Sequence, residues 1–237
     1  MSTTPETDCR SPTAFFDAEA AHYDASYERD DWAGRFLRAR MNTVLEELGE
    51  GRGRVLDAGM GGGRLVAELE ARGWTATGID PSPRMVELAL RRLPQLADRL
   101  LEADLAALPF PDETFEAAVA TGALEYVGDL DRGLRELARV LRPGGTAVLS
   151  FPNYRSPHAL WRRFALYPAA RLAKRVLPLS RPAPLRPLHP ITPRRFESAL
   201  AAAGFHTVAR RPIAPRVGGK SRVAELIAPQ LLFEAVK

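Results

Sequence analysis

The sequence has a single cysteine, Cys9, among its 237 residues. An intrachain disulfide is therefore excluded, which fits a reducing compartment. The sequence also lacks an apolar run near the ~18 residues that a membrane span needs, and its first ten residues lack the basic-then-apolar pattern of a secretion signal. No Cys or His cluster suggests a metal site. We therefore expect a cytoplasmic protein with no bound metal.

Acidic residues are missing from one long stretch. The net charge is +4, but residues 137–196 contain twelve Lys or Arg and no Asp or Glu. Within this stretch, residues 152–190 are rich in Pro, Arg and aromatics. A basic segment over residues 155–195 suits a lid over a substrate, contact with an anionic membrane surface, or recognition of an acidic substrate or carrier protein. The plain alternative is the solvated face of an ordinary lid.

Hydrophobic periodicity divides the chain. We expect residues 1–12 to be a disordered tail and residues 13–237 to be one domain, with lid helices over 13–50 and an inserted substrate cap over 152–190. Between them, short apolar runs alternate with helical segments, which predicts an α/β fold whose open, mainly parallel sheet has helices on both faces. The expected strands are 54–58, 75–80, 99–104, 115–121, 146–151, 206–213 and 231–237. The expected helices are 14–28, 32–48, 64–72, 83–93, 130–141 and 193–203.

The stretch V-L-D-A-G-M-G-G-G-R-L, residues 55–65, places four glycines directly after a short apolar run. A strand, a glycine-rich turn and a helix form a nucleotide-binding element whose backbone N–H groups face the ligand. The dinucleotide pattern G-x-G-x-x-G fails here, because its sixth place falls on Arg64 or Val66. Instead the pattern is D-x-G-x-G-x-G, and the carboxylate of Asp57 would repel a pyrophosphate but could hold an ammonium. We therefore expect a cationic or zwitterionic ligand.

Two further carboxylates end the next predicted strands. Asp80 stands at the tip of the second strand, where an acid can accept hydrogen bonds from two ribose hydroxyls. Asp104 ends the third, where it could accept from an adenine amino group while a neighbouring backbone N–H reaches a ring nitrogen. The plain alternative for Asp80 is that it only caps the helix that begins at Pro83.

Together these motifs resemble the class I S-adenosylmethionine-dependent methyltransferases, in the small-molecule branch that includes the ubiquinone and menaquinone biosynthesis enzymes. The resemblance covers residues 15–151 and 191–237. It rests on D-A-G-M-G-G-G-R-L, G-I-D-P-S-P-R-M-V-E-L-A, A-D-L-A-A-L-P-F-P-D-E-T-F-E and L-R-P-G-G-T. It implies a Rossmann-like, seven-stranded sheet of order 3-2-1-4-5-7-6 with the last strand antiparallel. It also implies S-adenosylmethionine as the cofactor and S-adenosylhomocysteine as the product.

The resemblance also implies roles for matching positions. The glycines would wrap the methionine part of the cofactor, Asp57 would lie near its amino group, and Asp80 would bind the ribose. Asp104 and the backbone of Leu105 would bind adenine, the residues after strand four would line the sulfonium, and a lid tyrosine would touch the cofactor. The expected cofactor-binding residues are Tyr23, Asp57, Gly59, Gly61, Gly63, Asp80, Pro81, Ser82, Asp104, Leu105, Thr121, Gly122 and Ala123.

The methyl acceptor is signalled more weakly, because the cofactor carries the chemistry of an in-line displacement. The N-P-P-Y motif of amino-methylating nucleic-acid enzymes is missing after strand four, where T-G-A-L-E-Y stands, so nucleic acid is disfavoured. We expect transfer to an oxygen or nitrogen of a small, partly apolar metabolite. His189 and then His158, which flank the insertion, are the candidate general bases or acceptor-orienting groups. The alternative for each is a surface or packing histidine.

Two other classes of function compete with this interpretation. One is an NAD-type oxidoreductase, which Asp57 and the missing sixth-place glycine disfavour. The other is a non-catalytic module that binds a nucleotide or associates with a membrane.

Overall fold

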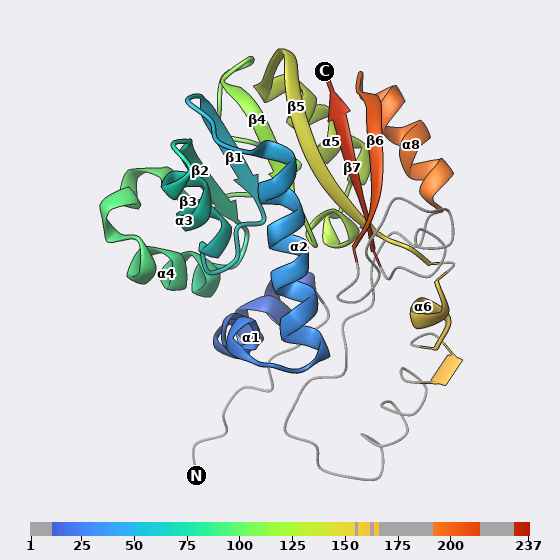
Figure 1. Cartoon of the computed structure of the whole chain (residues 1–237). Coiled ribbons are helices and arrows are strands. Elements are labelled where there is room, and N and C mark those ends of the chain that lie inside the picture. Colours follow the sequence, from blue (N-terminus) through green and yellow to red (C-terminus); the bar gives the residue numbers. More distant parts are fainter. Residues whose placement is uncertain (1–10, 155, 162–163, 166–191, 214–229) are drawn as a thin grey trace, which may run out of the picture.

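A computed structural model of the chain describes residues 11–154, 156–161, 164–165, 192–213 and 230–237 (Figure 1). Its seven strands are β1 (Arg54–Ala58), β2 (Thr75–Asp80), β3 (Leu100–Glu102), β4 (Phe115–Ala120), β5 (Leu141–Pro152), β6 (His206–Ile213) and β7 (Gln230–Val236). The α-helices are α1 (Pro12–Ala25), α2 (Trp32–Leu48), α3 (Arg64–Ala71), α4 (Pro83–Arg92), α5 (Leu130–Val140), α6 (Pro157–Trp161) and α8 (Pro193–Ala202). Three short 3-10 turns are η1 (Ser26–Glu28), η2 (Pro94–Arg99) and η3 (Leu124–Tyr126).

The strands form one sheet of order β3-β2-β1-β4-β5-β7-β6. Strands β1 to β5 pair in parallel, and β7 lies antiparallel between β5 and β6. This confirms the expected fold class, the strand order and the antiparallel last strand. Because five neighbouring strands are parallel, their carboxyl ends meet along one edge, where ligands bind in such sheets.

Helices cover both faces of the sheet (Figure 1). Side chains of α2, α3 and α4 share one buried cluster with one face of the strands, and side chains of α5 and α8 share a second cluster with the other face. Neighbouring residues of a strand belong to opposite clusters, as Val55 and Leu56 do, because successive side chains point to opposite faces. The central strands are therefore held from both sides by apolar burial.

Several helices begin where the sequence supplies a polar cap. The Oγ of Ser82 accepts a hydrogen bond from the N–H of Met85 at the start of α4, and the carboxylates of Asp31 and Asp129 accept likewise from Gly34 and Arg132. Such caps satisfy N–H groups that the first helical turn leaves unpaired. In α4 the cap also fixes where the helix begins after β2.

The largest difference from the expected elements is at β5, which begins at Leu141 rather than at residue 146. The Pro-Gly-Gly sequence, residues 143–145, lies inside the strand at a shift in register against β4. Gly144 donates its N–H to the carbonyl of Lys237, and Lys237 donates to Gly145. The end of β7 therefore continues the ladder across the irregularity, which sequence periodicity alone does not reveal.

The expected tail, residues 1–12, and the expected cap, residues 152–190, fall largely outside the described residues, which include 11–12 of the tail and 152–154, 156–161 and 164–165 of the cap. Pro12, placed in the tail, begins α1. The stretch 13–50, expected to form lid helices, holds most of α1, then η1 and α2. No helix in the described part of the chain is long and apolar enough to cross a membrane.

Candidate functional site

A cavity of about 320 Å³ lies at the carboxyl ends of β1, β2 and β4. Twelve of the thirteen expected cofactor-binding residues line it: Tyr23, Asp57, Gly59, Gly61, Asp80, Pro81, Ser82, Asp104, Leu105, Thr121, Gly122 and Ala123. We call Asp57, residues 59–62 and Asp80 the floor of this cavity. We call its wall of Phe16, Tyr23, Asp24, Tyr27 and Arg40, which belong to α1, η1 and α2, the roof.

The glycine loop of the floor turns sharply back from β1. Gly59 and Gly61 have φ of 90° and 53°, a backbone region that favours glycine. The N–H groups of Gly59 and Met60 both donate to the carbonyl of Ile79, at 2.8 and 2.9 Å, which ties the loop to β2. Gly63 does not line the cavity. A methyl group there would lie 3.0 Å from the Cβ of Ala89, so this glycine lets α3 begin close to α4.

Asp80 ends β2 and holds the glycine loop in place. Its carboxylate accepts the N–H of Gly61 at 3.0 Å and that of Ser82 at 2.9 Å. Burial raises the pKa of Asp80 to about 6, although these two backbone hydrogen bonds work against the rise. Asp80 therefore does more than cap a helix: it joins the floor to β2 and leaves its carboxylate at the wall of the cavity.

Asp57 is the second carboxylate of the floor, and only 2% of its surface is exposed. Burial and then the charge of Asp80 raise the pKa of Asp57 to about 7, and the cation of Arg40 opposes this rise. Two buried carboxylates side by side favour a ligand that carries a positive charge or donates hydrogen bonds.

Asp104 lies two residues beyond β3, which ends at Glu102 rather than reaching residue 104 as expected. Its carboxylate accepts the N–H of Ala106 at 2.8 Å and its carbonyl accepts that of Ala107 at 2.9 Å. This turn brings Leu105, which is buried, to the cavity wall.

The turn after β4 also lines the cavity, with Thr121, Gly122 and Ala123. It is fixed by the N–H of Gly122, which donates to the Oγ of Ser150.

Arg40 is the main cavity residue that the sequence reasoning missed. It lies on α2, is 7% exposed, and donates from Nη2 to the hydroxyl of Tyr23 at 2.9 Å. Burial alone would lower the pKa of Arg40, but the neighbouring Tyr23, Tyr27 and Glu125 raise it by more. The net effect is a pKa above the ordinary value of arginine, so the side chain is charged. Within the described residues, no carboxylate lies at ion-pair distance from it. An arginine on the apolar stripe of α2, between Leu37 and Val44, was the available signal.

Aromatic rings make up much of the roof. The ring of Phe16 lies edge-on to Tyr23 and Tyr126, with centroids 5.9 and 5.2 Å apart, and Tyr23 lies edge-on to Tyr27. The rings come from α1, η1 and η3, so the roof joins the N-terminal helices to the loop after β4. Such rings exclude water and can attract a cation.

The two histidines expected to act on the acceptor are not brought to the cavity by any described contact. His189 lies outside the described residues, and for His158 only the backbone is described, in α6. Among the described side chains, no group of three or more His, Cys, Asp or Glu could hold a metal ion.

The sequence and the fold of this chain are similar to those of known methyltransferases. A protein-family model described as "Methyltransferase domain" matches residues 56–149, which include the glycine loop, Asp80 and β4. The crystal structure of a SAM-dependent methyltransferase, possible histamine N-methyltransferase, from Thermotoga maritima covers 94% of this chain and 98% of its own, with a TM-score of 0.63 and 18% identity. At that identity the likeness shows the shared fold.

Two curated relatives each match about half of the chain. A malonyl-[acyl-carrier protein] O-methyltransferase of Halorhodospira halophila is 38% identical over 134 residues, which are 54% of this chain and 45% of that protein. A demethylmenaquinone methyltransferase of Thermus thermophilus is 40% identical over 124 residues, which are 50% of this chain and 56% of that protein. The matched part spans about half the length of these relatives.

Proposed function

The chain carries a class I S-adenosylmethionine-dependent methyltransferase domain, and from this premise we propose that it transfers a methyl group to an oxygen or nitrogen of a small, partly apolar molecule. The observation that carries the proposal is the set of charges around one cavity. Two buried carboxylates, Asp57 and Asp80, face it together with the buried cation of Arg40. A nucleoside that bears an amino acid offers the complementary charges.

The cavity residues fit each part of that cofactor. Asp80 would accept the ribose hydroxyls, and the turn at Asp104 and Leu105 would bind adenine. Asp57 would lie near the ammonium, and Arg40, which lacks a carboxylate partner among the described residues, would pair with the methionine carboxylate. Gly59 and Gly61 leave the floor without side chains where the methionine arm would pass.

The cofactor supplies a methyl group on a sulfonium, and the protein has to align two reactants and exclude water. The edge-on rings of Phe16, Tyr23 and Tyr126 supply a water-excluding wall. Thr121, Gly122 and Ala123 line the cavity directly after β4, where the acceptor would approach the sulfonium. His189 and His158 stay the candidates for removing a proton from the acceptor, a step needed only where the acceptor must lose one.

The names of the two curated relatives support either a small-molecule acceptor or one attached to an acyl carrier protein. The basic segment over residues 155–195 suits the acidic carrier, and it equally suits an anionic membrane that holds a lipid-like acceptor. The proposal therefore includes an acceptor bound to an acyl carrier protein and a lipid-like acceptor held in a membrane.

Titration calorimetry tests the methyl donor. We expect S-adenosylmethionine and S-adenosylhomocysteine each to bind with one site per chain and NAD not to bind. Binding of NAD alone would support the oxidoreductase alternative, and binding of none of the three would end the proposal. Transfer of a labelled methyl group to a malonyl-loaded acyl carrier protein, to free malonate and to a demethylated quinone would then identify the acceptor class.

A further inference from the structure

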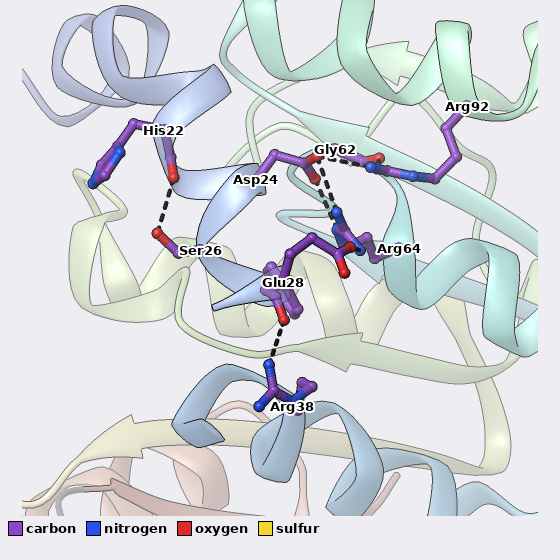
Figure 2. Close-up of polar contacts among 9 residues, drawn as sticks. His22, Asp24, Ser26, Glu28, Arg38, Gly62, Arg64 and Arg92 are labelled. Carbon is purple, nitrogen blue, oxygen red and sulfur yellow. Dashed lines mark hydrogen bonds and ion pairs between the residues drawn. The ribbon is translucent and has the colours of Figure 1, made fainter. Parts of the chain in front are cut away.

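Asp24, near the end of α1, lies between two arginines that come from the body of the domain (Figure 2). Its Oδ1 accepts from Nε of Arg64 at 3.0 Å, and its Oδ2 accepts from Nη2 of Arg92 at 2.8 Å. Arg64 is the first residue of α3 and Arg92 the last of α4. Arg64 also pairs with Glu28 of η1 at 2.6 Å. One carboxylate of the roof therefore joins two helices that flank the floor.

This cluster is better shielded than an ordinary surface ion pair. The side chain of Asp24 is 15% exposed, and those of Arg64 and Arg92 are 25% and 26% exposed. Burial raises the pKa of Asp24, but the hydrogen bonds from Arg92 and Arg64 outweigh it and hold the pKa below its ordinary value. Asp24 is therefore ionised at neutral pH, and its bonds to both arginines are charge-assisted.

Gly62 connects the same cluster to the glycine loop. Its carbonyl accepts from Nη1 of Arg92, the residue that also holds Asp24 (Figure 2). Unlike Gly59 and Gly61, Gly62 does not have a positive φ, so backbone conformation does not require a glycine there. Space does: a methyl group would lie 2.6 Å from Oδ1 of Asp24 and 3.0 Å from Nη1 of Arg92. The glycine outside the D-x-G-x-G-x-G pattern thus makes room for the roof.

Apart from this cluster, helix α1 is held over the cavity by aromatic rings and by hydrogen bonds of Asp17 and Tyr23. Ala20 is its only fully buried residue, so apolar burial anchors it weakly. At its other end, the carboxylate of Asp17 accepts from the Oγ of Ser82 and from the N–H of Arg84, at 3.0 and 2.9 Å. Polar contacts therefore fix both ends of a helix that lines the cavity with Phe16, Tyr23 and Asp24.

We propose that Asp24, Arg64 and Arg92 form an ionic latch that holds α1 closed over the cofactor and couples this closure to the glycine loop through Gly62. The proposal rests on the function proposed above. Opening the roof requires both bonds of Asp24 to break, so the latch slows the departure of cofactor and product. Because Arg92 holds Gly62 and Asp24 together, closure of the roof also steadies the loop that carries the methionine arm.

The test measures release of S-adenosylhomocysteine from the full chain, by chasing bound labelled product with excess unlabelled product. Asp24→Asn is expected to speed release about tenfold, since it removes the charge that two partly buried arginines share. Gly62→Ala is expected to do the same by pushing Asp24 away from Arg92. Arg91→Gln is the matched control, because Arg91 is the neighbour of Arg92 on α4 but, among the described residues, pairs only with the exposed Glu87. This variant should leave release unchanged.

A second variant and a salt series keep the test independent of folding. The single variant Arg92→Gln removes the bonds to Asp24 and to the carbonyl of Gly62. In the double variant Asp24→Asn/Arg92→Gln, release should be no faster than in Arg92→Gln alone, because both changes act on one latch. In the wild type, release should quicken as salt rises from 50 to 500 mM, and in Asp24→Asn, which keeps only the pair of Arg64 with the exposed Glu28, it should quicken less. Release within twofold of the wild type in both Asp24→Asn and Gly62→Ala would overturn the latch. A wild type that does not bind the product would instead overturn the proposed function.

Discussion

The floor and the roof of the cavity are built in different ways. The floor follows β1 and β2, strands in which every residue but the first is buried, and apolar clusters hold them from both faces. In the roof, Arg40 belongs to α2, which packs into the core, but the other roof residues belong to α1 and η1. Helix α1 buries one residue and is held by ion pairs and edge-on aromatic rings. The floor is therefore fixed by the core, whereas the α1 part of the roof is fixed by side-chain contacts that can break singly.

Because of this difference, we expect the floor and the roof to affect different properties of cofactor binding. A floor that cannot move without disturbing the core can supply pre-arranged acceptors, and so affinity. A roof held by a few polar contacts can open at low cost and supply access. Variants of the floor should therefore change how tightly the cofactor binds, and variants of the roof should also change how fast it exchanges.

The largest effect is expected from Asp80→Ala, which tests the floor. The change removes the carboxylate expected to accept the ribose hydroxyls and also frees the N–H of Gly61. We expect affinity for S-adenosylhomocysteine to fall about 100-fold in calorimetry, since two hydrogen bonds to a charged group are lost.

Asp98→Ala is the matched control, because Asp98 is an exposed carboxylate in η2 outside the cavity. It should bind as the wild type does. If Asp80→Ala also bound normally, Asp80 would serve only to hold the loop and the helix, and the floor would lose its role in affinity.

A smaller effect is expected from Arg40→Met, which tests whether the roof also binds. The change removes a buried charge but keeps the length of the side chain, and we expect affinity for S-adenosylmethionine to fall about tenfold to thirtyfold. Decarboxylated S-adenosylmethionine shows whether that loss comes from the missing pair between Arg40 and the methionine carboxylate or from a general disturbance of the roof. The wild type should bind it more weakly than the intact cofactor, and Arg40→Met should bind both alike.

Arg35→Gln is the control on the same helix, because Arg35 is exposed and lies 3.6 Å from Asp30. It should keep the preference of the wild type for the intact cofactor. An Arg40→Met variant that still preferred the intact cofactor would show that the methionine carboxylate is bound elsewhere.

The sequence reveals the floor better than the roof for a physical reason. Asp57, the glycines and Asp80 each stand at the end of a strand, so local pattern and parallel topology suffice to bring them together. The bounds of β1 and β2 agree with the expected ones, and the expected sheet order is confirmed. Tyr23, on α1, was the one roof residue expected at the cofactor, and it rested on the family resemblance.

The polar contacts of the roof join residues far apart in the chain, and no local pattern predicts them. Asp24 meets Arg64 and Arg92 across 40 and 68 positions. Arg40 occupies an apolar stripe where a hydrophobic residue would be ordinary, so only its charge marks it. Gly63 is a residue for which the local pattern predicted too much. Its place in the glycine motif predicted contact with the cofactor, whereas in the structure it packs against Ala89.

The smallest effect is a pH dependence that comes from the floor. Burial raises the pKa of Asp57 to about 7 from an ordinary 3.8. In the free protein this carboxyl keeps a proton that the unfolded chain has lost above about pH 4. Its contribution to stability is therefore present below pH 4 and is lost as pH rises through 7. We expect the unliganded protein to melt at a lower temperature at pH 7.5 than at pH 6.

Binding should respond in the opposite direction. An ammonium beside Asp57 favours the ionised carboxylate, so cofactor binding releases a proton below pH 7. Affinity should rise up to about tenfold between pH 6 and pH 7 and level off above, because one proton per site changes affinity at most tenfold per pH unit. Asp57→Asn should remove this slope, while the rise that Asp80 contributes near pH 6 remains. A wild type whose affinity rises between pH 6 and pH 7 no more than that of Asp57→Asn would place the ammonium away from Asp57, and the floor would then recognise the cofactor through Asp80 alone.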